Sequence, residues 1–242
     1  MKTVALIPAR FASTRFPGKM LAKLGGKTVI RSTYDAAMNL NLFDAVYVVT
    51  DHQGIYDEIA GYGGNALMSV KSHETGTDRI AEAAENISAD IILNIQGDEP
   101  FIKREPIHKL IAAFEDDRVD VATLVQRLYA QKEINAPDFV KVVKDVNDFV
   151  LYFSRSPIPY HRQDAEKPDY YEHIGVYAFR KEALLRFSRT SPTPNERAEK
   201  VEPIRFLEHG MKIKVLTTDY MGIEIDTEED LIKANNFINQ LG

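Results

Sequence analysis

The chain has 242 residues, 44% of them hydrophobic and 27% charged, which is enough to bury the core of an ordinary globular protein. A formal net charge of −6 argues against a general nucleic-acid-binding protein, and the lack of any cysteine excludes disulfides, thiolate metal sites and a cysteine nucleophile. No apolar run approaches the ~20 residues that span a bilayer, and the run at residues 4–9 is too short for a signal peptide. We therefore expect a cytoplasmic protein without a membrane segment.

The first half of the chain alternates between two kinds of pattern. Short β-branched runs bounded by turn residues predict strands at residues 3–8, 45–50, 65–70, 90–96 and 120–125. Helical spacing predicts helices at residues 29–40, 54–61, 77–87 and 106–115. Nearly unbroken apolar strands that alternate with helices are typical of a parallel sheet covered on both faces. The pattern therefore predicts an α/β fold.

The second half begins with a different pattern. Strand-like runs at residues 140–144, 150–154 and 174–180 flank a segment, 157–170, that is rich in Pro, Tyr and charge. We interpret this part as a β-insertion with a long loop, because no linker composition precedes it. The chain then predicts helices at residues 181–188, 198–210 and 227–241 and a strand at residues 212–217. We accordingly predict a single domain over residues 1–242.

A basic, glycine-containing loop follows the first strand. Arg10, Arg15 and Lys19 lie close together there, beside Gly18. Clustered cations favour an anionic ligand, and glycine lets backbone N–H groups approach a phosphate, so the loop indicates a polyphosphate site. It is not a Walker A loop, because the pattern G-x-x-x-x-G-K-[ST] is absent. The alternative is a solvated basic loop.

Acidic residues follow another predicted strand. Gln96, Asp98 and Glu99 close the run at residues 90–96, and ligands of open α/β sheets bind beyond the carboxyl ends of strands. Carboxylates beside a phosphate loop suit Mg²⁺. If the chain leaves the strand extended, Asp98 and Glu99 point opposite ways, so we expect only one to bind. The alternative is a solvated acidic turn.

Two further segments allow more than one interpretation. Asp226, in the acidic segment 224–230, is either a second metal carboxylate or a helix cap, and spacing alone favours the cap. In the segment 73–79, Gly76 and Thr77 present backbone groups to a base or ribose, or Thr77 and Asp78 simply cap a helix. Without further context, the cap is the better interpretation here too.

The predicted insertion contains an arginine and a histidine of interest. Arg155 lies ahead of two prolines on a stiff, non-helical segment, and such an arginine can bind a carboxylate through two parallel hydrogen bonds. His173, near the start of a strand, either donates to a hydroxyl or carboxylate or is structural. Neither residue identifies the substrate by itself.

Taken together, these motifs resemble the 3-deoxy-manno-octulosonate cytidylyltransferases (CMP-Kdo synthetases), and the resemblance covers essentially the whole chain. It rests on Ile7-Pro8-Ala9-Arg10, Ser13, Arg15, Pro17-Gly18-Lys19, Leu21, Gly76-Thr77-Asp78-Arg79, Gln96-Gly97-Asp98, Tyr152-Phe153-Ser154-Arg155 and His173…Gly175-Val176-Tyr177. It implies a Rossmann-like nucleotide-diphospho-sugar transferase fold, with a mostly parallel central sheet, helices on both faces and a β-insertion. Residues 1–125 would bind CTP, about 138–180 would bind sugar and contact a second copy, and 181–242 would close the domain.

The resemblance implies an enzyme that transfers CMP from CTP to Kdo, releasing diphosphate, for lipopolysaccharide biosynthesis. The implied CTP contacts are Ala9, Arg10, Ser13, Arg15, Lys19, Gly76, Thr77 and Arg79. The implied sugar contacts are Gln96, Arg155, His173, Tyr177 and Glu202. Asp98 and Asp226 would bind Mg²⁺ and, with Lys19, form the catalytic set, so the resemblance reverses the capping interpretation of Asp226. It also implies a homodimer, with no nucleic-acid partner.

The chain departs from the family pattern at three places. Met20 follows the Gly-Lys pair where the family has proline, and residues 222–226 replace a shorter approach to the metal carboxylate. Pro203 stands where the family has an amide that can bind a sugar hydroxyl. Alternative acceptors are therefore a related sugar acid, such as an 8-amino form of Kdo or an acylneuraminate. Two competing hypotheses are a different sugar nucleotidyltransferase and a non-catalytic nucleotide-binding protein.

Overall fold

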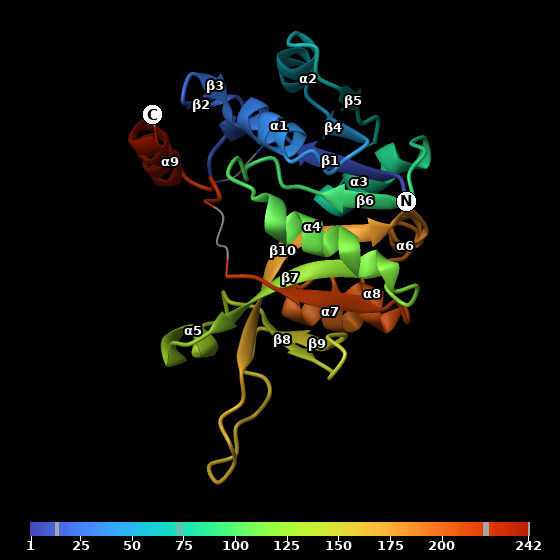
Figure 1. Cartoon of the computed structure of the whole chain (residues 1–242), viewed down its shortest axis with the longest axis vertical. Helices are drawn as coiled ribbons and strands as arrows, with labels where there is room; N and C mark the ends of the chain where they lie inside the picture. The colour runs from blue at the N-terminus through green and yellow to red at the C-terminus, as the bar shows by residue number, and fades with distance from the viewer. Residues whose placement is uncertain (13–14, 72, 74, 220–222, 242) are drawn as a thin grey trace. The chain divides into compact units, whose positions relative to one another are not determined.

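Two compact units make up the chain. The computed structural model describes residues 1–12, 15–71, 73, 75–219 and 223–241. Unit 1 consists of residues 1–104 and 221–242, and unit 2 consists of residues 105–220 (Figure 1). Each unit combines helices with strands, so the α/β class is confirmed. The grouping into one domain with the three predicted subdivisions stays a prediction.

The strands of unit 1 are parallel. They are β1 (Thr3–Ala9), β4 (Ala45–Thr50), β5 (Ala66–Met68) and β6 (Ile91–Asn94), in the spatial order β6-β1-β4-β5. All seven residues of β1 are buried, which explains why its sequence is an apolar run rather than an alternating one. The carboxyl ends of β1 and β6 are neighbours in this arrangement, so the loops that follow them begin at the same edge.

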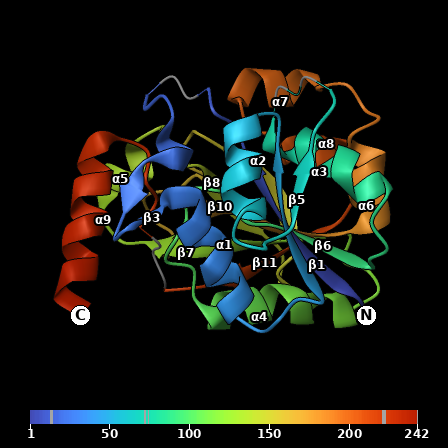
Figure 2. The same ribbon diagram turned by 90° about the horizontal axis from the view of Figure 1, so that it is seen from above.

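Helices α1 (Val29–Asn39), α2 (Gln53–Ala60) and α3 (Gly76–Glu85) connect these strands. Right-handed crossovers place α1 and α2 on one face of the strands. Helix α3 belongs to the connection that returns from β5 to β6, so it lies on the opposite face (Figure 2). The predicted helices agree with α1, α2 and α3 to within a few residues at each end.

Two smaller parts complete unit 1. A hairpin of β2 (Lys23–Leu24) and β3 (Lys27–Thr28), which the sequence patterns do not predict, turns at Gly25 and Gly26, whose φ values are 55° and 85°. The final helix, α9 (Glu228–Leu241), contributes Ala234 to a core cluster with Leu24, Val29 and Ile225. This cluster ties the C-terminal part of the chain to the segment that follows the basic loop.

The strands of unit 2 are mixed. β7 (Val121–Leu128) lies parallel to β11 (Ile213–Thr217) and antiparallel to β10 (Tyr170–Arg180). β8 (Lys141–Lys144) pairs antiparallel with both β10 and β9 (Val150–Ser154). These antiparallel strands confirm the predicted β-insertion, and the chain between β9 and β10 forms its long loop (Figure 1).

The helices of unit 2 include one clear correction. They are α4 (Arg104–Ala112), the 3-10 turn η2 (Ala113–Glu115), α5 (Gln131–Asn135), α6 (Lys181–Phe187), α7 (Pro194–Glu199) and α8 (Ile204–Glu208). The predicted helix at residues 198–210 is wrong: Lys200 ends α7 in a left-handed conformation, with φ 55°, and Pro203 precedes α8. The two short helices are joined by a buried ion pair in which Arg205 Nε donates to Glu196 over 2.8 Å.

Candidate functional site

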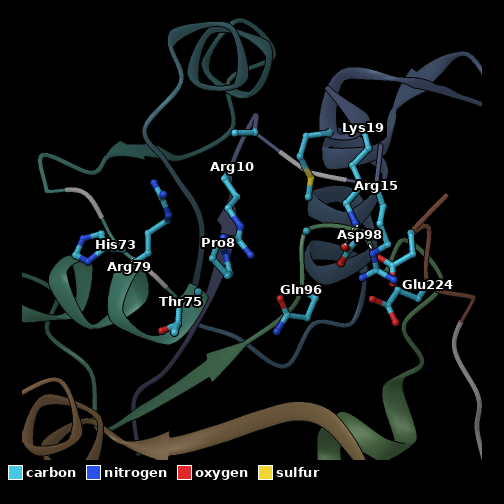
Figure 3. A pocket seen from close by; sticks show the side chains of 15 residues that line it. Pro8, Arg10, Arg15, Lys19, His73, Thr75, Arg79, Gln96, Asp98 and Glu224 are labelled. Carbon is cyan, nitrogen blue, oxygen red and sulfur yellow. Dashed lines mark hydrogen bonds and ion pairs between the residues drawn. The ribbon is translucent and has the colours of Figure 1, made fainter. Parts of the chain in front are cut away.

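A pocket of about 310 Å³ lies in unit 1, at the ends of β1 and β6. Its lining combines cations, carboxylates and small residues (Figure 3): Pro8, Arg10, Ala12, Arg15, Lys19, Met20, His73, Thr75, Gly76, Arg79, Gln96, Gly97, Asp98, Glu224 and Asp226. The location agrees with the rule that ligands of open α/β sheets bind beyond the carboxyl ends of the strands. Most of the predicted nucleotide and metal residues therefore meet in one pocket.

Lys19 lies between two carboxylates at one end of this pocket. It lies in the 3-10 turn η1 (Lys19–Leu21) and is 6% exposed. Its Nζ donates to Asp98 over 2.5 Å and to Asp226 over 3.0 Å, and Arg15 contacts the other oxygen of Asp226 at 2.9 Å. Although burial opposes it, the carboxylates of Asp98 and Asp226 raise the pKa of Lys19 above its usual value. Lys19 is therefore a firmly charged ammonium.

Three carboxylates gather beside Lys19. Asp98, Glu224 and Asp226 each place one oxygen within 4.8 Å of the others. Burial and the charges of Asp98 and Asp226 raise the pKa of Glu224 to about 7, although its side chain reaches the surface. Burial, Asp98 and Glu224 likewise raise the pKa of Glu99 to about 8. Crowded carboxylate oxygens are a donor set that fits Mg²⁺, a hard cation with oxygen ligands.

The segment 223–226 explains how two of these carboxylates converge. It is not helical, and Ile225 is fully buried in the cluster with Leu24 and Val29, while its N–H donates to Asp98 O over 3.0 Å. Its neighbours Glu224 and Asp226 instead bring their carboxylate oxygens together with that of Asp98. Asp226 is not a helix cap: Thr227 Oγ1 accepts from Asp230 N at 3.2 Å instead, which corrects the interpretation from spacing.

Glu224 is a site residue that spacing alone does not reveal. Its position in the sequence groups it with the helix-capping charges that follow it, although the alternation Glu224, Ile225, Asp226 is a signal that could have identified it. Of Asp98 and Glu99, only Asp98 belongs to the group of three carboxylates, and the expectation that only one of the two binds metal stays a prediction. The backbone there is a turn rather than extended chain, since Glu99 N donates to Gln96 O over 3.2 Å.

The other end of the pocket holds Arg79 and His73 (Figure 3). Arg79 is 3% exposed, and its Nη2 donates to Asp51 over 2.6 Å, whereas its Nη1 has no hydrogen-bond partner in the described part of the chain. His73 Nε2 lies 2.6 Å from Glu82. A buried guanidinium nitrogen without a partner is costly, so this end is suited to a ligand that accepts hydrogen bonds.

The remaining predicted nucleotide residues are placed as follows. Arg10 and Gly76 line the pocket, whereas the buried Ala9 and Thr77 do not, and Ser13 lies outside the described residues. The cap of α3 is Thr75, whose Oγ1 accepts from Asp78 N at 3.1 Å, rather than Thr77 or Asp78. Two glycines let neighbouring side chains pack closely against the backbone. A Cβ on Gly76 would lie 3.2 Å from Pro8 Cγ, and one on Gly97 would lie 3.0 Å from Met20 Sδ.

Gln96 lines the pocket of unit 1, but the other four predicted sugar residues belong to unit 2. Among them, Arg155 is held by three backbone carbonyls: Nε donates to Glu199 O over 2.7 Å, Nη1 to Pro137 O over 2.8 Å and Nη2 to Lys200 O over 3.2 Å. Each terminal nitrogen keeps a second N–H. The guanidinium therefore has a fixed position and retains two donors.

His173, Tyr177 and Glu202 form a group of their own in unit 2. The ring of His173 packs against Tyr177 at 5.2 Å between centroids. Burial lowers the pKa of His173 to about 4, and burial together with the charge of Glu202 raises the pKa of Tyr177 well above its usual value. At neutral pH both rings are therefore uncharged, and each can hydrogen bond to a hydroxyl group.

The chain is similar to known cytidylyltransferases. The sequence model of a family described as cytidylyltransferase matches residues 4–213. The 3-deoxy-manno-octulosonate cytidylyltransferase of Flavobacterium johnsoniae is 50% identical, with full coverage of both chains. The enzyme of the same name from Christiangramia forsetii is also 50% identical, over 98% of this chain and 97% of its own.

Solved structures extend the comparison. A CMP:2-keto-3-deoxy-manno-octonic acid synthetase complexed with CTP superimposes with a TM-score of 0.94 at 36% identity, and all of both chains is covered. A 4-diphosphocytidyl-2C-methyl-D-erythritol synthase from Anaerococcus prevotii has a TM-score of 0.62 at 20% identity, over 98% of this chain and 99% of its own. The second likeness concerns the fold alone.

Proposed function

This chain belongs to the cytidylyltransferase family, and from that premise we propose the reaction that it catalyses and the residues that carry it. It transfers CMP from CTP to the anomeric hydroxyl of Kdo, giving CMP-Kdo and diphosphate. The observation that carries this conclusion is the pocket in which Lys19, Asp98 and Asp226, separated widely in the sequence, contact one another beside Arg10 and Arg15.

The cations of the pocket bind the triphosphate. Lys19, Arg10 and Arg15, together with Ser13 of the same loop, hold the phosphates. Gly76 and Gly97 line the same pocket and pack closely against Pro8 and Met20. The nucleoside end is assigned to Arg79, whose Nη1 has no hydrogen-bond partner in the described part of the chain. Ala9 and Thr77 stay family-implied nucleotide contacts, next in sequence to the lining residues Arg10 and Gly76. This division matches the two ends of the pocket: Lys19 and the carboxylates lie at one, and Arg79 and His73 lie at the other (Figure 3).

Asp98 and Asp226 would hold Mg²⁺, and Glu224 offers a third oxygen. When bound, Mg²⁺ would polarise the α-phosphate and lower the pKa of the attacking hydroxyl. The sugar oxygen attacks the α-phosphorus in line and forms the new O–P bond. The bond between the α-phosphorus and the oxygen that bridges it to the β-phosphorus breaks, diphosphate leaves, and the hydroxyl proton passes to water. Lys19 and the arginines offset the charge that builds on the leaving diphosphate.

Residues of unit 2 bind the sugar acid. Arg155 binds its carboxylate with the two N–H groups that remain free of backbone carbonyls, because a fixed guanidinium suits a bidentate carboxylate. His173, Tyr177 and Glu202 bind its hydroxyls. Positioning of the two anionic substrates supplies much of the rate enhancement.

Three wider proposals rest on the family. The product serves lipopolysaccharide biosynthesis, the enzyme acts in the cytoplasm, and it forms a homodimer to which the β-insertion contributes. Within the described residues, no helix is long and apolar enough to cross a membrane. Light scattering coupled to gel filtration tests the homodimer, and a monomer at working concentration would contradict it.

Diphosphate release tests the function as a whole. CTP, UTP, ATP and GTP are each incubated with Kdo, 8-amino-Kdo or N-acetylneuraminate in the presence of Mg²⁺. We expect rapid release with CTP and Kdo. Preferred release with 8-amino-Kdo would support the related acceptor that Pro203 leaves open, because a proline cannot supply an amide to a sugar hydroxyl. No release with any pair would favour a binding protein.

A further inference from the structure

Strand β10 is irregular where it passes Thr123 of β7. Ile174 pairs with Leu124, but the next paired residue is Tyr177, opposite Thr123, so Gly175 and Val176 are additional residues in β10. Bulges of this kind redirect side chains and carbonyls locally. Here the bulge brings both Ile174 O and Val176 O to the hydroxyl of Thr123, at 3.0 Å and 2.8 Å.

The hydroxyl of Thr123 has three possible hydrogen-bond partners but only one proton to donate. Its side chain is fully buried, and His173 Nε2 lies 3.2 Å from Oγ1, farther away than either carbonyl oxygen. A hydroxyl has one proton to donate, and a carbonyl can only accept. If the proton is directed to a carbonyl, Oγ1 can only accept from the histidine. The ring nitrogen Nε2 must then be the one that carries hydrogen.

His173 has a single N–H in this environment. Its ring lies 5.2 Å from both Phe153 and Tyr177, measured between centroids, and burial lowers its pKa to about 4. A neutral imidazole has one donor and one acceptor nitrogen, and the hydrogen bond of one fixes the role of the other. Nδ1 is therefore the acceptor, and among the described residues it has no hydrogen-bond partner.

We propose that Thr123 is a positioning residue that fixes His173 as the Nε2–H tautomer, so that Nδ1 accepts a hydrogen bond from a hydroxyl of the sugar acid. This inference rests on the proposed function, which assigns His173 to the sugar. An acceptor nitrogen attracts hydroxyls but not a carboxylate, which has no proton to give at neutral pH. Nδ1 and the Arg155 guanidinium thus select different groups of a polyhydroxy acid, a hydroxyl and the carboxylate.

The tautomer is measured first, without any substrate. Long-range ¹H–¹⁵N correlation spectra of the ¹⁵N-labelled full chain at neutral pH distinguish a protonated from an unprotonated ring nitrogen, and His173→Gln identifies the resonances of His173 among the six histidines. We expect a protonated Nε2 and an unprotonated Nδ1. A protonated Nδ1, an averaged mixture or a doubly protonated ring would overturn the proposal.

Two matched variants then connect the tautomer to substrate binding. Thr123→Val keeps the shape but removes the hydroxyl, and Thr123→Ser keeps the hydroxyl. For Thr123→Val we expect mixed ring tautomers and a KM for Kdo that rises about 3- to 10-fold, the equivalent of one neutral hydrogen bond, with the KM for CTP unchanged. Thr123→Ser should retain the wild-type spectrum and the wild-type KM for Kdo.

A wild-type spectrum and KM in Thr123→Val, or an equal rise of both KM values, would contradict the proposal. If Thr123→Val does not fold, the wild-type spectrum and Thr123→Ser still decide the question. Failure of the proposed function is a different result: the wild-type chain would then release no diphosphate with CTP and Kdo, whatever tautomer its histidine shows.

Discussion

The two compact units hold their predicted site residues in contrasting ways. In unit 1, charged side chains contact one another: Lys19 bridges Asp98 and Asp226, which are 79 and 207 residues away in the sequence. In unit 2, Arg155 is fixed by backbone carbonyls and His173 by a buried hydroxyl. A metal and a triphosphate can replace contacts between charged side chains. A backbone-held side chain instead offers a fixed shape, as recognition of a sugar acid requires.

The largest expected effect concerns the charges of unit 1. Asp98→Asn preserves shape but removes the charge that faces Lys19 and the other carboxylates, so we expect kcat/KM to fall at least about 1000-fold, or ~4 kcal/mol. Diphosphate release over a Mg²⁺ titration measures it, and near-normal turnover at limiting Mg²⁺ would contradict the assignment.

Glu99→Gln is the matched control. Because the pKa of Glu99 is raised to about 8, this carboxyl is mainly protonated at pH 7, and an amide resembles it closely. The control should therefore fold and turn over much as the wild type does. A loss as large as that of Asp98→Asn would mean that the whole acidic turn, rather than Asp98, is required.

The next effect tests the backbone-held site of unit 2. Arg155→Met removes three hydrogen bonds to carbonyls as well as the cation, so we expect a KM for Kdo raised about 10- to 100-fold, with an unfolding free energy lower by about 1–3 kcal/mol. Asp98→Asn breaks one ion pair of Lys19 but also removes one of three crowded carboxylate charges, so its loss of stability should be smaller.

Kinetics and chemical denaturation of Arg155→Met are measured together. Arg155→Lys is the control, because it keeps the charge but not the planar donor fork. If Arg155→Met lost stability but retained its KM for Kdo, the three carbonyl bonds would be the whole role of Arg155, and the carboxylate would be bound elsewhere.

The smallest effect concerns acid stability in unit 1. Despite burial, the contacts of Glu82 with His73, Ser69 Oγ and Val70 N lower its pKa to about 2, below the usual value of 4.5. A lowered folded-state pKa gives stability that is complete above pH 4.5 and is lost as the pH falls toward 2. We expect this contribution to be about 1–3 kcal/mol.

Denaturant unfolding between pH 6 and pH 3 measures that contribution, with Glu82→Gln as the comparison. The wild type should lose stability more steeply than the variant as the pH falls below 4.5. Parallel curves for the two proteins would show that the contacts of Glu82 do not favour its charged form.

Local sequence patterns predicted most of the fold and much of the site. Strand β1 is fully buried and therefore reads as a continuous apolar run, and the residues after β1 and β6 line the pocket because parallel strands end at one edge. The prediction of one helix at residues 198–210 is wrong, although apolar residues there have helical spacing. Lys200, in a left-handed conformation, and Pro203 interrupt the helix.

The residues that escaped prediction depend on tertiary contacts. In the sequence, Glu224 resembles the capping charges that follow it. Only the structure shows that Ile225 is buried and that Glu224 and Asp226 lie in one group of carboxylates. Thr123 is an ordinary β-branched residue in a strand until the bulge at residues 174–177 places two carbonyls against it. Neither the core contact nor the register of an antiparallel pair is visible in the order of residues alone.

The most direct test of the central claim follows the oxygen that joins sugar to phosphorus. Kdo labelled with ¹⁸O at its anomeric hydroxyl is converted with CTP, and ³¹P NMR of the product is compared with an enzyme-free sample that records exchange of the label with water. Attack by the sugar hydroxyl on the α-phosphorus predicts an isotope shift on the phosphorus of CMP-Kdo, because the label stays in the bridge. A product that forms without the label would contradict the account.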